Sequence, residues 1–361
     1  MSNQNLFLDI HAIQTLPPSN INRDDTGSPK TAQYGGVRRA RVSSQSWKRA
    51  MRTYFYENGG DTNVGVRTLE IVKYVADKIQ ELDSSKDTEE AMGLADKVLN
   101  AAKIKTKDQR ARALFFLGDI QAKQLAQAAI EGEKDKKELQ KILKNNPAID
   151  IALFGRMVAD DPSLNEDASS QIAHAISTHS VQTEFDFYTA VDDLAPEDNA
   201  GAGMLGTLEF NSSTLYRYGN VAIHELMKQL GDKEGVLNTL KLFIQAFSNS
   251  LPTGKANSYA NQTLPQALMV NVRTDRPVNL VTAFEEPVKS LEGNVSSSIR
   301  KLFDELSRVE KFVDKPEFTL YLTVDEFEHF SGNSVNEENL KDLLEDFMRK
   351  VDGLLSENSG D

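Results

Sequence analysis

The chain has 361 residues, of which 39% are hydrophobic and 26% charged, enough for one large globular unit or two smaller ones. It contains no cysteine, which excludes disulfide bonds, thiol catalysis and thiolate metal ligands. No apolar stretch is long enough to span a bilayer, and the polar first five residues do not resemble a secretory signal. We therefore expect a cytoplasmic protein that does not bind a membrane.

Charge is distributed unevenly along the chain. The whole sequence carries a net charge of −13, yet the stretch from Arg23 to Arg52 holds eight cations against two acids, a local charge of +6. The remainder therefore carries −19. A basic segment on an acidic body is typical of a polyanion-binding site whose other surfaces repel polyanions.

The first predicted elements are a buried strand over residues 6–13 and an irregular loop over residues 20–36. Residues 37–42 are expected to form a short strand or an extended segment, and a helix follows over residues 44–58. The strand is expected to end before Pro17 because proline cannot donate to a central ladder. Ser43 or Ser44 is expected to cap the helix, and Gly59 to end it.

The middle of the chain, residues 66–146, reads as an almost wholly helical insertion, in which Leu114 and Leu117 keep helical spacing. A Gly-rich stretch over residues 195–207 suggests a protruding hairpin. Further strands are predicted over residues 149–155, 171–183, 208–221, 268–272 and 318–322. Further helices are predicted over residues 222–230, 234–250 and 336–355. Interleaved strands and helices indicate an α/β or α+β class.

Enzyme motifs are missing from the sequence. It has no phosphate-binding P-loop, no dinucleotide-binding glycine pattern and no nucleophile elbow. His174 and His179 are five residues apart, which on a strand puts them on opposite faces, so a shared metal is not expected. We expect neither a cofactor nor a metal.

Paired acids occur at residues 24–25, 160–161 and 192–193, and such pairs either bind Mg²⁺ or cap helices and pair with Arg. Asp24 and Asp25 are the pair that lies inside the basic segment, where a metal-dependent nuclease would need its acid. A nuclease therefore stays open as an alternative function.

The basic segment combines several features that favour phosphate binding. Gly35 and Gly36 would let backbone amides approach a phosphate, and the helix that starts near Ser43 would offer its N-terminal amides. Lys48 and Arg52 are four residues apart and share a helical face. The alternative is an ordinary solvated basic surface, with Arg39 and Arg41 merely pairing with acids.

Several blocks of sequence strongly resemble one protein family. Residues 16–25 read Leu-Pro-Pro-Ser-Asn-Ile-Asn-Arg-Asp-Asp, and residues 34–52 run from Tyr-Gly-Gly-Val-Arg-Arg to Ser-Trp-Lys-Arg-Ala-Met-Arg. With residues 150–157, 173–179, 187–194 and 206–220, they resemble the backbone subunit of the type I-E CRISPR surveillance complex Cascade (the CasC, or Cas-seven, family). The helical block and the acidic C-terminus match more loosely.

The resemblance implies an α+β fold shaped like a right hand. An RRM-like (ferredoxin-like) palm would comprise residues 1–60 and 147–361, with helical fingers inserted at 61–146 and a thumb β-hairpin at 190–215. Copies of the chain would form a helical filament along one CRISPR RNA, beside other Cascade subunits. They would present the spacer for pairing with target DNA in antiviral defence. The subunit itself would not be catalytic, because a recruited helicase-nuclease cuts the DNA.

The basic segment and the resemblance together predict the site residues. We expect RNA contacts from Arg23, Lys30, Arg41, Ser43, Ser44, Gln45, Lys48, Arg49, Arg52, Met157, Phe187, Tyr188, Thr189, Met204 and Leu205. Phe187 stands where relatives can have Trp, so the stacking face is kept and the indole N–H is lost.

A second predicted surface concerns DNA. The segment from Asp135 to Asn145 predicts an amphipathic helix whose outer lysines, aligned along a filament, would form a basic track. We expect Lys137, Lys141 and Lys144 to bind DNA, although in a single copy the neighbouring acids would make this an ordinary solvated face.

Two other functions remain open at this stage. One is a metal-dependent ribonuclease of the type III backbone-subunit kind, with Asp24 or Asp25 as its acid. The other is a general binder of single strands.

Overall fold

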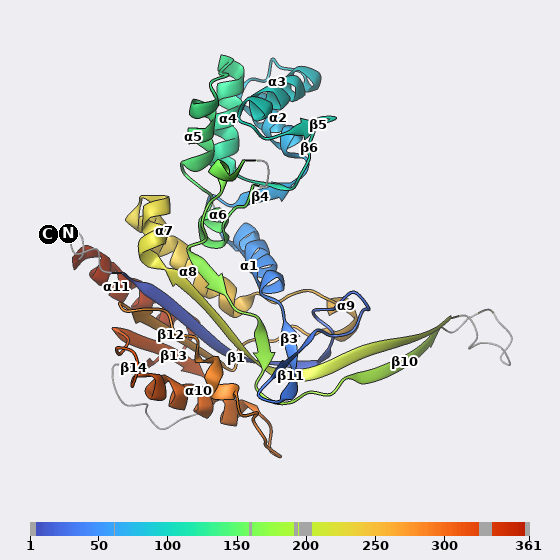
Figure 1. The fold of residues 1–361 in the computed structure, drawn as a ribbon, viewed down its shortest axis with the longest axis vertical. Coiled ribbons are helices and arrows are strands. Elements are labelled where there is room, and N and C mark those ends of the chain that lie inside the picture. The colour runs from blue at the N-terminus through green and yellow to red at the C-terminus, as the bar shows by residue number, and fades with distance from the viewer. Residues whose placement is uncertain are drawn as a thin grey trace.

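The computed structural model describes residues 5–60, 62–158, 161–190, 194, 204–324 and 334–357, with only the backbone of Ala190, Met204 and Leu205. Figure 1 shows a twisted sheet with helices packed on it, a separate group of helices at one end and a long two-stranded arm. The fold is mixed α+β, which confirms the predicted class. No helix in the described ranges has the length and apolarity to cross a membrane.

One large sheet organises the molecule. Its strands, in spatial order, are β14 (Ser334–Asn336), β13 (Phe318–Thr323), β12 (Ala267–Arg273), β1 (Phe7–Ser19), β11 (Met204–Ala222), β9 (Ala175–Ser177), β3 (Val37–Val42) and β2 (Thr31–Tyr34). Two further strands, β8 (Ser170–Ile172) and β10 (Glu184–Ala190), also pair with β11. β13 and β14 are parallel, and the other pairs are antiparallel.

The central strand β1 is longer than predicted. It continues through Pro17 and Pro18, and its pairing with β11 shifts register between Leu16 and Ser19. The shift leaves both prolines out of the ladder, so their missing N–H groups cost no hydrogen bond. The predicted end of the strand before Pro17 is therefore wrong.

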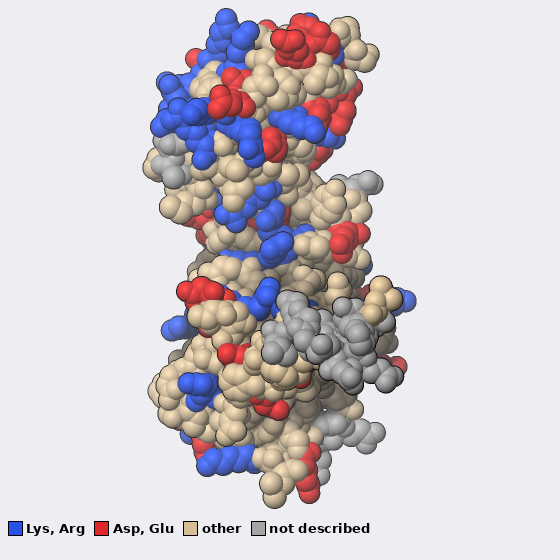
Figure 2. Space-filling model, turned by 90° about the vertical axis from the view of Figure 1, so that its right-hand side faces the viewer, with Lys and Arg blue, Asp and Glu red and all other residues tan. Residues whose placement is uncertain are grey.

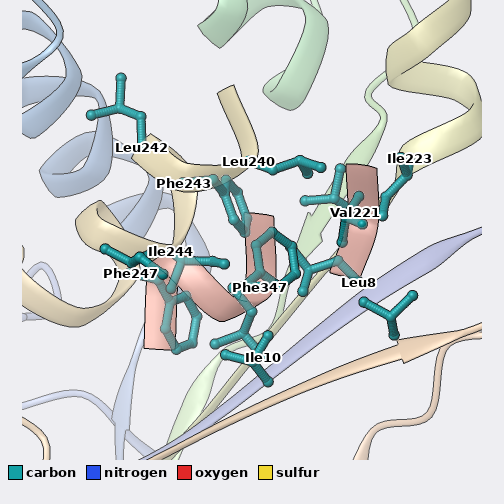
Figure 3. Close-up of a cluster of buried hydrophobic side chains, with 14 of the residues drawn as sticks. Leu8, Ile10, Val221, Ile223, Leu240, Leu242, Phe243, Ile244, Phe247 and Phe347 are labelled. Carbon is teal, nitrogen blue, oxygen red and sulfur yellow. The ribbon is translucent and has the colours of Figure 1, made fainter. Parts of the chain in front are cut away.

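The two faces of the sheet carry separate cores, because side chains alternate along β1. Leu8 and Ile10 face a cluster shared with α1 (Ser44–Asn58), α7 (Ile223–Leu230), α8 (Lys233–Asn249) and α11 (Leu340–Glu357) (Figure 3). Ile13 faces the opposite cluster, formed with the 3-10 helix η3 (Leu280–Phe284) and α10 (Val295–Val309). The helices predicted near α7, α8 and α11 are confirmed, whereas α10 was not predicted.

The helical insertion has a core of its own, built from α2 (Ile71–Leu82), α3 (Thr88–Ala101), α4 (Asp119–Glu131) and α5 (Lys136–Lys144). It also contains the strand pairs β4 (Gly65–Thr68) with β7 (Phe115–Gly118), and β5 (Thr106–Lys107) with β6 (Arg110–Ala111). The prediction of an almost wholly helical block is therefore wrong at these strands. All of β7 is buried, so Leu117 lies in a buried strand, whereas Leu114 precedes that strand and is exposed; the spacing of the two did not mark a helix face.

Residues 149–155 were predicted as a strand and form the short helix α6 (Ile149–Phe154). A short apolar run that is buried all round has no period that separates strand from helix. The predicted strand over residues 171–183 is reduced to β8 and β9, and residues 31–34 of the predicted loop form β2. Two short helices complete the described elements, η1 (Pro162–Leu164) and α9 (Ala256–Tyr259).

Candidate nucleic-acid interface

The start of α1 is held by two polar contacts of its first residues. Ser43 caps the helix, and its Oγ accepts a hydrogen bond from the Ser46 amide at 3.4 Å. The Ser44 amide donates to Nδ1 of His174 at 2.9 Å. Burial, with help from Arg41 and Lys30, lowers the pKa of His174, which keeps the ring neutral and able to accept. The Ser44 amide is therefore already used, and this part of the predicted anion site at the helix start is not available.

Lys48 and Arg52 lie one turn apart on α1 and are both partly buried. Lys48 Nζ lies 5.5 Å from the centroid of the Phe154 ring, and burial lowers the pKa of this lysine. Arg52 Nε lies 3.0 Å from Oδ2 of the buried Asp150, and its guanidinium stacks over Phe116 at 4.3 Å. Much of the charge of Arg52 is thus matched within the protein.

Residues predicted to contact RNA meet in one open groove beside α1, with a volume of about 810 Å³. Those that line it are Gln45, Lys48, Arg49, Arg52 and Met157. The side chain of Met157 is 84% exposed, in the loop that follows α6. Figure 2 shows Lys and Arg atoms in a broken band that runs down the middle of this side of the molecule.

The groove also contains residues that the sequence analysis missed. Arg67, Leu114 and Phe116 of the helical insertion line it. The wall of the groove is therefore formed by the insertion together with α1. The role of these three residues depends on how the insertion packs against α1, and no local sequence pattern indicates it.

A second open groove, of about 1,100 Å³, lies on the other side of Arg49 and contains Arg23, Asp24 and Asp25. Asp24 Oδ1 accepts hydrogen bonds from the Thr26 amide and hydroxyl and from the Ser28 amide. These bonds, led by that of the Thr26 hydroxyl, lower the pKa of Asp24. No cluster of three metal-ligating side chains occurs among the described residues.

Lys30 and Arg41 lie next to the start of α1. The Arg41 amide donates to the Lys30 carbonyl at 2.9 Å, and Arg41 Nε donates to the Thr31 carbonyl at 3.3 Å. With Asn22 and Asn211 they line a small cavity. In this bond the Arg41 side chain contacts a backbone carbonyl and not an acidic side chain.

Gly35, Gly36 and Arg39 have structural roles that differ from those predicted. The two glycines form the turn between β2 and β3 with φ of 57° and 76°, and a Cβ on Gly35 would lie 1.7 Å from the Glu285 carbonyl oxygen. Arg39 is fully buried and donates to the carbonyls of Tyr34, Ser177, Phe284 and Glu285. The approach of these glycines to a phosphate stays a prediction, whereas the alternative in which Arg39 pairs with acids is wrong, because its guanidinium bonds backbone carbonyls.

The projecting arm in Figure 1 is formed by β10 paired with residues 204–210 of β11. Tyr188 pairs with Gly206, and a Cβ on that glycine would meet the tyrosine ring at 2.3 Å. Because side chains alternate along a strand, Phe187 and Thr189 face the other side of the arm. The three residues therefore lie on two faces of the arm, and their RNA contacts stay a prediction.

Phe185 adds a feature that the sequence analysis missed. It is 67% exposed and, by strand alternation, shares a face with Phe187, which is 65% exposed. Alternating aromatics at residues 185 and 187 were a signal that could have found it. Met204 and Leu205 are described by their backbone in β11, and residues 160, 191–193 and 195–203, with their paired acids and glycines, lie outside the described residues.

The lysines of α5 are exposed on the helical insertion. Asp135 caps the helix, and Lys141 Nζ lies 2.6 Å from Oε1 of Glu138, a hydrogen bond that raises the pKa of this lysine. Lys137 and Lys144 are exposed. The predicted basic face is thus present, with one of its members paired to an acid of the same helix.

Comparisons with known proteins give related results. The sequence matches the model of the CT1975-like protein family over residues 8–348. A chain of a solved structure described as "CRISPR RNA-guided surveillance complex, pre-nicking" aligns with a TM-score of 0.84 and 34% identity, over 95% of this chain and 99% of that one. A chain of another, described as "CRISPR RNA-guided surveillance complex", aligns with a TM-score of 0.66 and 28% identity, over 96% and 99%. No curated protein matches the sequence.

Proposed function

The chain belongs to the CT1975-like family, and on that premise we propose that it is an RNA-binding backbone subunit of a CRISPR surveillance complex of type I-E. The likeness to a chain of an RNA-guided surveillance complex, at 34% identity over 95% of the sequence, supports this assignment. CRISPR RNA and further copies of the chain would be its immediate partners, together with other Cascade subunits.

The observation that carries the proposal is the groove beside α1. Gln45, Lys48, Arg49 and Met157 line it together although they come from two separate parts of the chain. Cationic and amide side chains bind phosphates and sugars without reading bases, as a subunit that accepts any guide must do. The exposed Met157 offers an apolar surface to a base.

The right-hand description of the fold is part of the proposal. The sheet with its helices would be an RRM-like palm, the insertion with its own core would be the fingers, and the β10–β11 arm would be the thumb. The exposed Phe185 and Phe187 support a stacking role for one face of the thumb. We place such a complex in the cytoplasm.

Copies of the subunit would polymerise along the guide and present it to target DNA, which a recruited helicase-nuclease would cut. The exposed lysines of α5 would bind that DNA outside the guide. We propose that the chain itself is not catalytic. Cleavage of complementary RNA with Mg²⁺, abolished by Asp24→Ala or Asp25→Ala, would instead establish the ribonuclease alternative.

The experiment replaces Lys48 and Arg49 with Gln and measures assembly on CRISPR RNA across a salt series. Binding should weaken equally for unrelated spacer sequences, and the slope of log affinity against log salt should fall by about 0.7 for each phosphate that the variant no longer binds. Lys73→Gln with Lys97→Gln, on exposed positions of α2 and α3, is the matched control for net charge. Unchanged affinity, or weaker binding confined to some spacers, would contradict the proposal.

A further inference from the structure

The β5–β6 hairpin of the helical insertion carries a concentration of charge that the α1 groove does not use. Between residues 103 and 112 the sequence Lys-Ile-Lys-Thr-Lys-Asp-Gln-Arg-Ala-Arg contains five cations and one acid. All five cations are exposed. No residue of this stretch lines the α1 groove within the described part of the chain.

The geometry of the hairpin puts four of these cations on one face. Lys107 pairs across the strands with Arg110, and the Arg112 amide donates to the Lys105 carbonyl at 3.1 Å. Cross-strand partners project to the same side, and so do residues two apart on one strand. Lys105, Lys107, Arg110 and Arg112 therefore share the outward face.

The inner face of the hairpin is anchored to the protein. The Thr106 hydroxyl donates to Asp96 at 2.6 Å and accepts from Asn100 at 2.5 Å, and both partners belong to α3. Ala111 is buried, and its amide donates to the Leu69 carbonyl at 2.8 Å. The outward cations are thus presented by a fixed support.

This arrangement places like charges close together. Lys107 and Arg110 lie directly across an antiparallel pair, where cations repel each other. Of these two, Arg110 has an acidic partner, Glu70, whose Oε1 lies 2.6 Å from Arg110 Nε. The turn residues Asp108 and Gln109 both have positive φ, which costs non-glycine residues additional strain. Such a cluster is stabilised by an extended polyanion that contacts several of its members at once.

Spacing indicates what kind of polyanion fits. Residues two apart on a strand are about 6.6 Å apart, similar to the interval between successive phosphates of a nucleic acid backbone. In Figure 1 the hairpin lies at the edge of the insertion opposite α5, on the side toward which β10 and β11 extend. It therefore faces the same side as the thumb and is separate from the α5 lysines.

We propose that the outward face of the β5–β6 hairpin binds the phosphodiester backbone of a second nucleic acid strand, outside the α1 groove that holds the first. This inference rests on the proposed function, because the first strand is the guide. The contact would be independent of sequence, since Lys and Arg on a flat two-stranded face meet phosphates and not base edges.

The test uses Lys107→Gln with Arg112→Gln, because within the described residues neither side chain has an ion pair or hydrogen bond. Complexes assembled on CRISPR RNA are titrated with complementary single-stranded DNA and with duplex target across a salt series. Target binding should weaken, with a salt slope shallower by about 1.8 for the duplex and about 1.4 for the single strand for each copy that engages the target. Weaker binding of both targets would mean that the hairpin contacts the target strand that pairs with the guide. Weaker binding of the duplex alone would mean that it contacts the displaced strand.

Lys73→Gln with Lys97→Gln is again the control, since it changes net charge equally on the same insertion. Target binding that is unchanged, or reduced as much by the control, would overturn the proposal. If the variant instead fails to assemble on RNA, the hairpin contacts the guide or an acidic face of a neighbouring copy, and the proposal is equally wrong. The unmodified chain must assemble on RNA in the same assay. If it does not, it is the proposed function that fails.

Discussion

The cations of the β3–α1 segment and those of the β5–β6 hairpin differ in what already surrounds them. Arg39 is buried among backbone carbonyls and Arg52 is paired with the buried Asp150. Lys107 and Arg112 of the hairpin are exposed. The stretch from Arg23 to Arg52, which has the larger total of cations, therefore offers less unpaired surface charge than its composition suggests. The local charge of +6 therefore overstates the charge at the surface, because it counts the buried Arg39 and the paired Arg52.

The largest expected effect comes from Arg39, the buried cation of the β3–α1 segment. Arg39→Met keeps much of the side-chain volume but leaves the carbonyls of Ser177 and Phe284 without their donors, and we expect it to lower the free energy of unfolding by about 3 kcal/mol. The neighbouring exposed Arg38 is the control, because Arg38→Met should change it by less than about 0.5 kcal/mol. Urea denaturation measures both. Equal decreases would mean that Arg39 is no more structural than Arg38.

A smaller decrease is expected for Arg52→Ala, about 2 kcal/mol at neutral pH, because it removes the charged hydrogen bond that a part-exposed guanidinium makes to the buried Asp150 carboxylate. Asp150→Asn in the same background should restore part of the stability, since the amide oxygen still accepts from the Gly65 amide. Unfolding free energies of the four proteins form a double-mutant cycle. No recovery in the double variant would show that the ion pair does not explain the decrease.

The deficit of Arg52→Ala should also depend on pH. Burial raises the pKa of Asp150 above 3.8, and Arg52 opposes this rise, so removal of Arg52 raises the pKa further. Below both pKa values the carboxyl is neutral in either protein and the charge-related deficit is absent. The deficit grows as pH rises from the pKa of Asp150 in the unmodified chain to its higher pKa in the variant. Urea titrations from about pH 4 to 7 would measure this trend, and a deficit that grows toward low pH would contradict it.

The exposed lysines of α5 extend the comparison from stability to DNA binding. Replacing Lys137, Lys141 and Lys144 with Ala should leave the RNA-bound complex intact and weaken duplex target binding with a shallower salt dependence. Binding of a complementary single strand should hardly change. Equal weakening for both targets, or for neither, would reduce this face to a solubilising surface.

The smallest expected effect lies in the β10–β11 arm. Tyr188→Ala removes the ring that covers Gly206, and we expect a local destabilisation of about 0.5 kcal/mol. Faster amide hydrogen exchange in residues 184–190 and 205–210 would report it. Phe187→Ala, on the exposed opposite face, is the control and should leave exchange nearly unchanged. Similar exchange in both variants would mean that the Tyr188–Gly206 pair does not hold the arm.

The sequence predicted those features that depend on neighbouring residues. The Ser43 cap with Trp47 and Met51 on one face predicts α1, and the apolar run near Val270 predicts β12. It failed at α6, where a buried apolar run has no diagnostic period. It also missed the β5–β6 hairpin, because Asp108-Gln109 lacks the glycine that marks such turns.

Most of the remaining errors concern contacts between distant parts of the chain. Arg39 and Arg49 look alike in the sequence, but Arg39 meets carbonyls of residues 177 and 284, whereas Arg49 lines the groove. The partner of Arg52 is nearly a hundred residues away. Local patterns therefore predicted a phosphate-binding segment, and only tertiary packing separates its structural cations from those that line the groove.

Native mass spectrometry of the chain co-expressed with a CRISPR array and the other complex subunits tests the central claim most directly. The account predicts a ribonucleoprotein that contains several copies of this chain on one RNA. Lys48→Gln with Arg49→Gln should reduce that assembly, and the Lys73→Gln with Lys97→Gln control should retain it. A chain that stays monomeric with the array present, or that assembles equally well without it, would contradict the account.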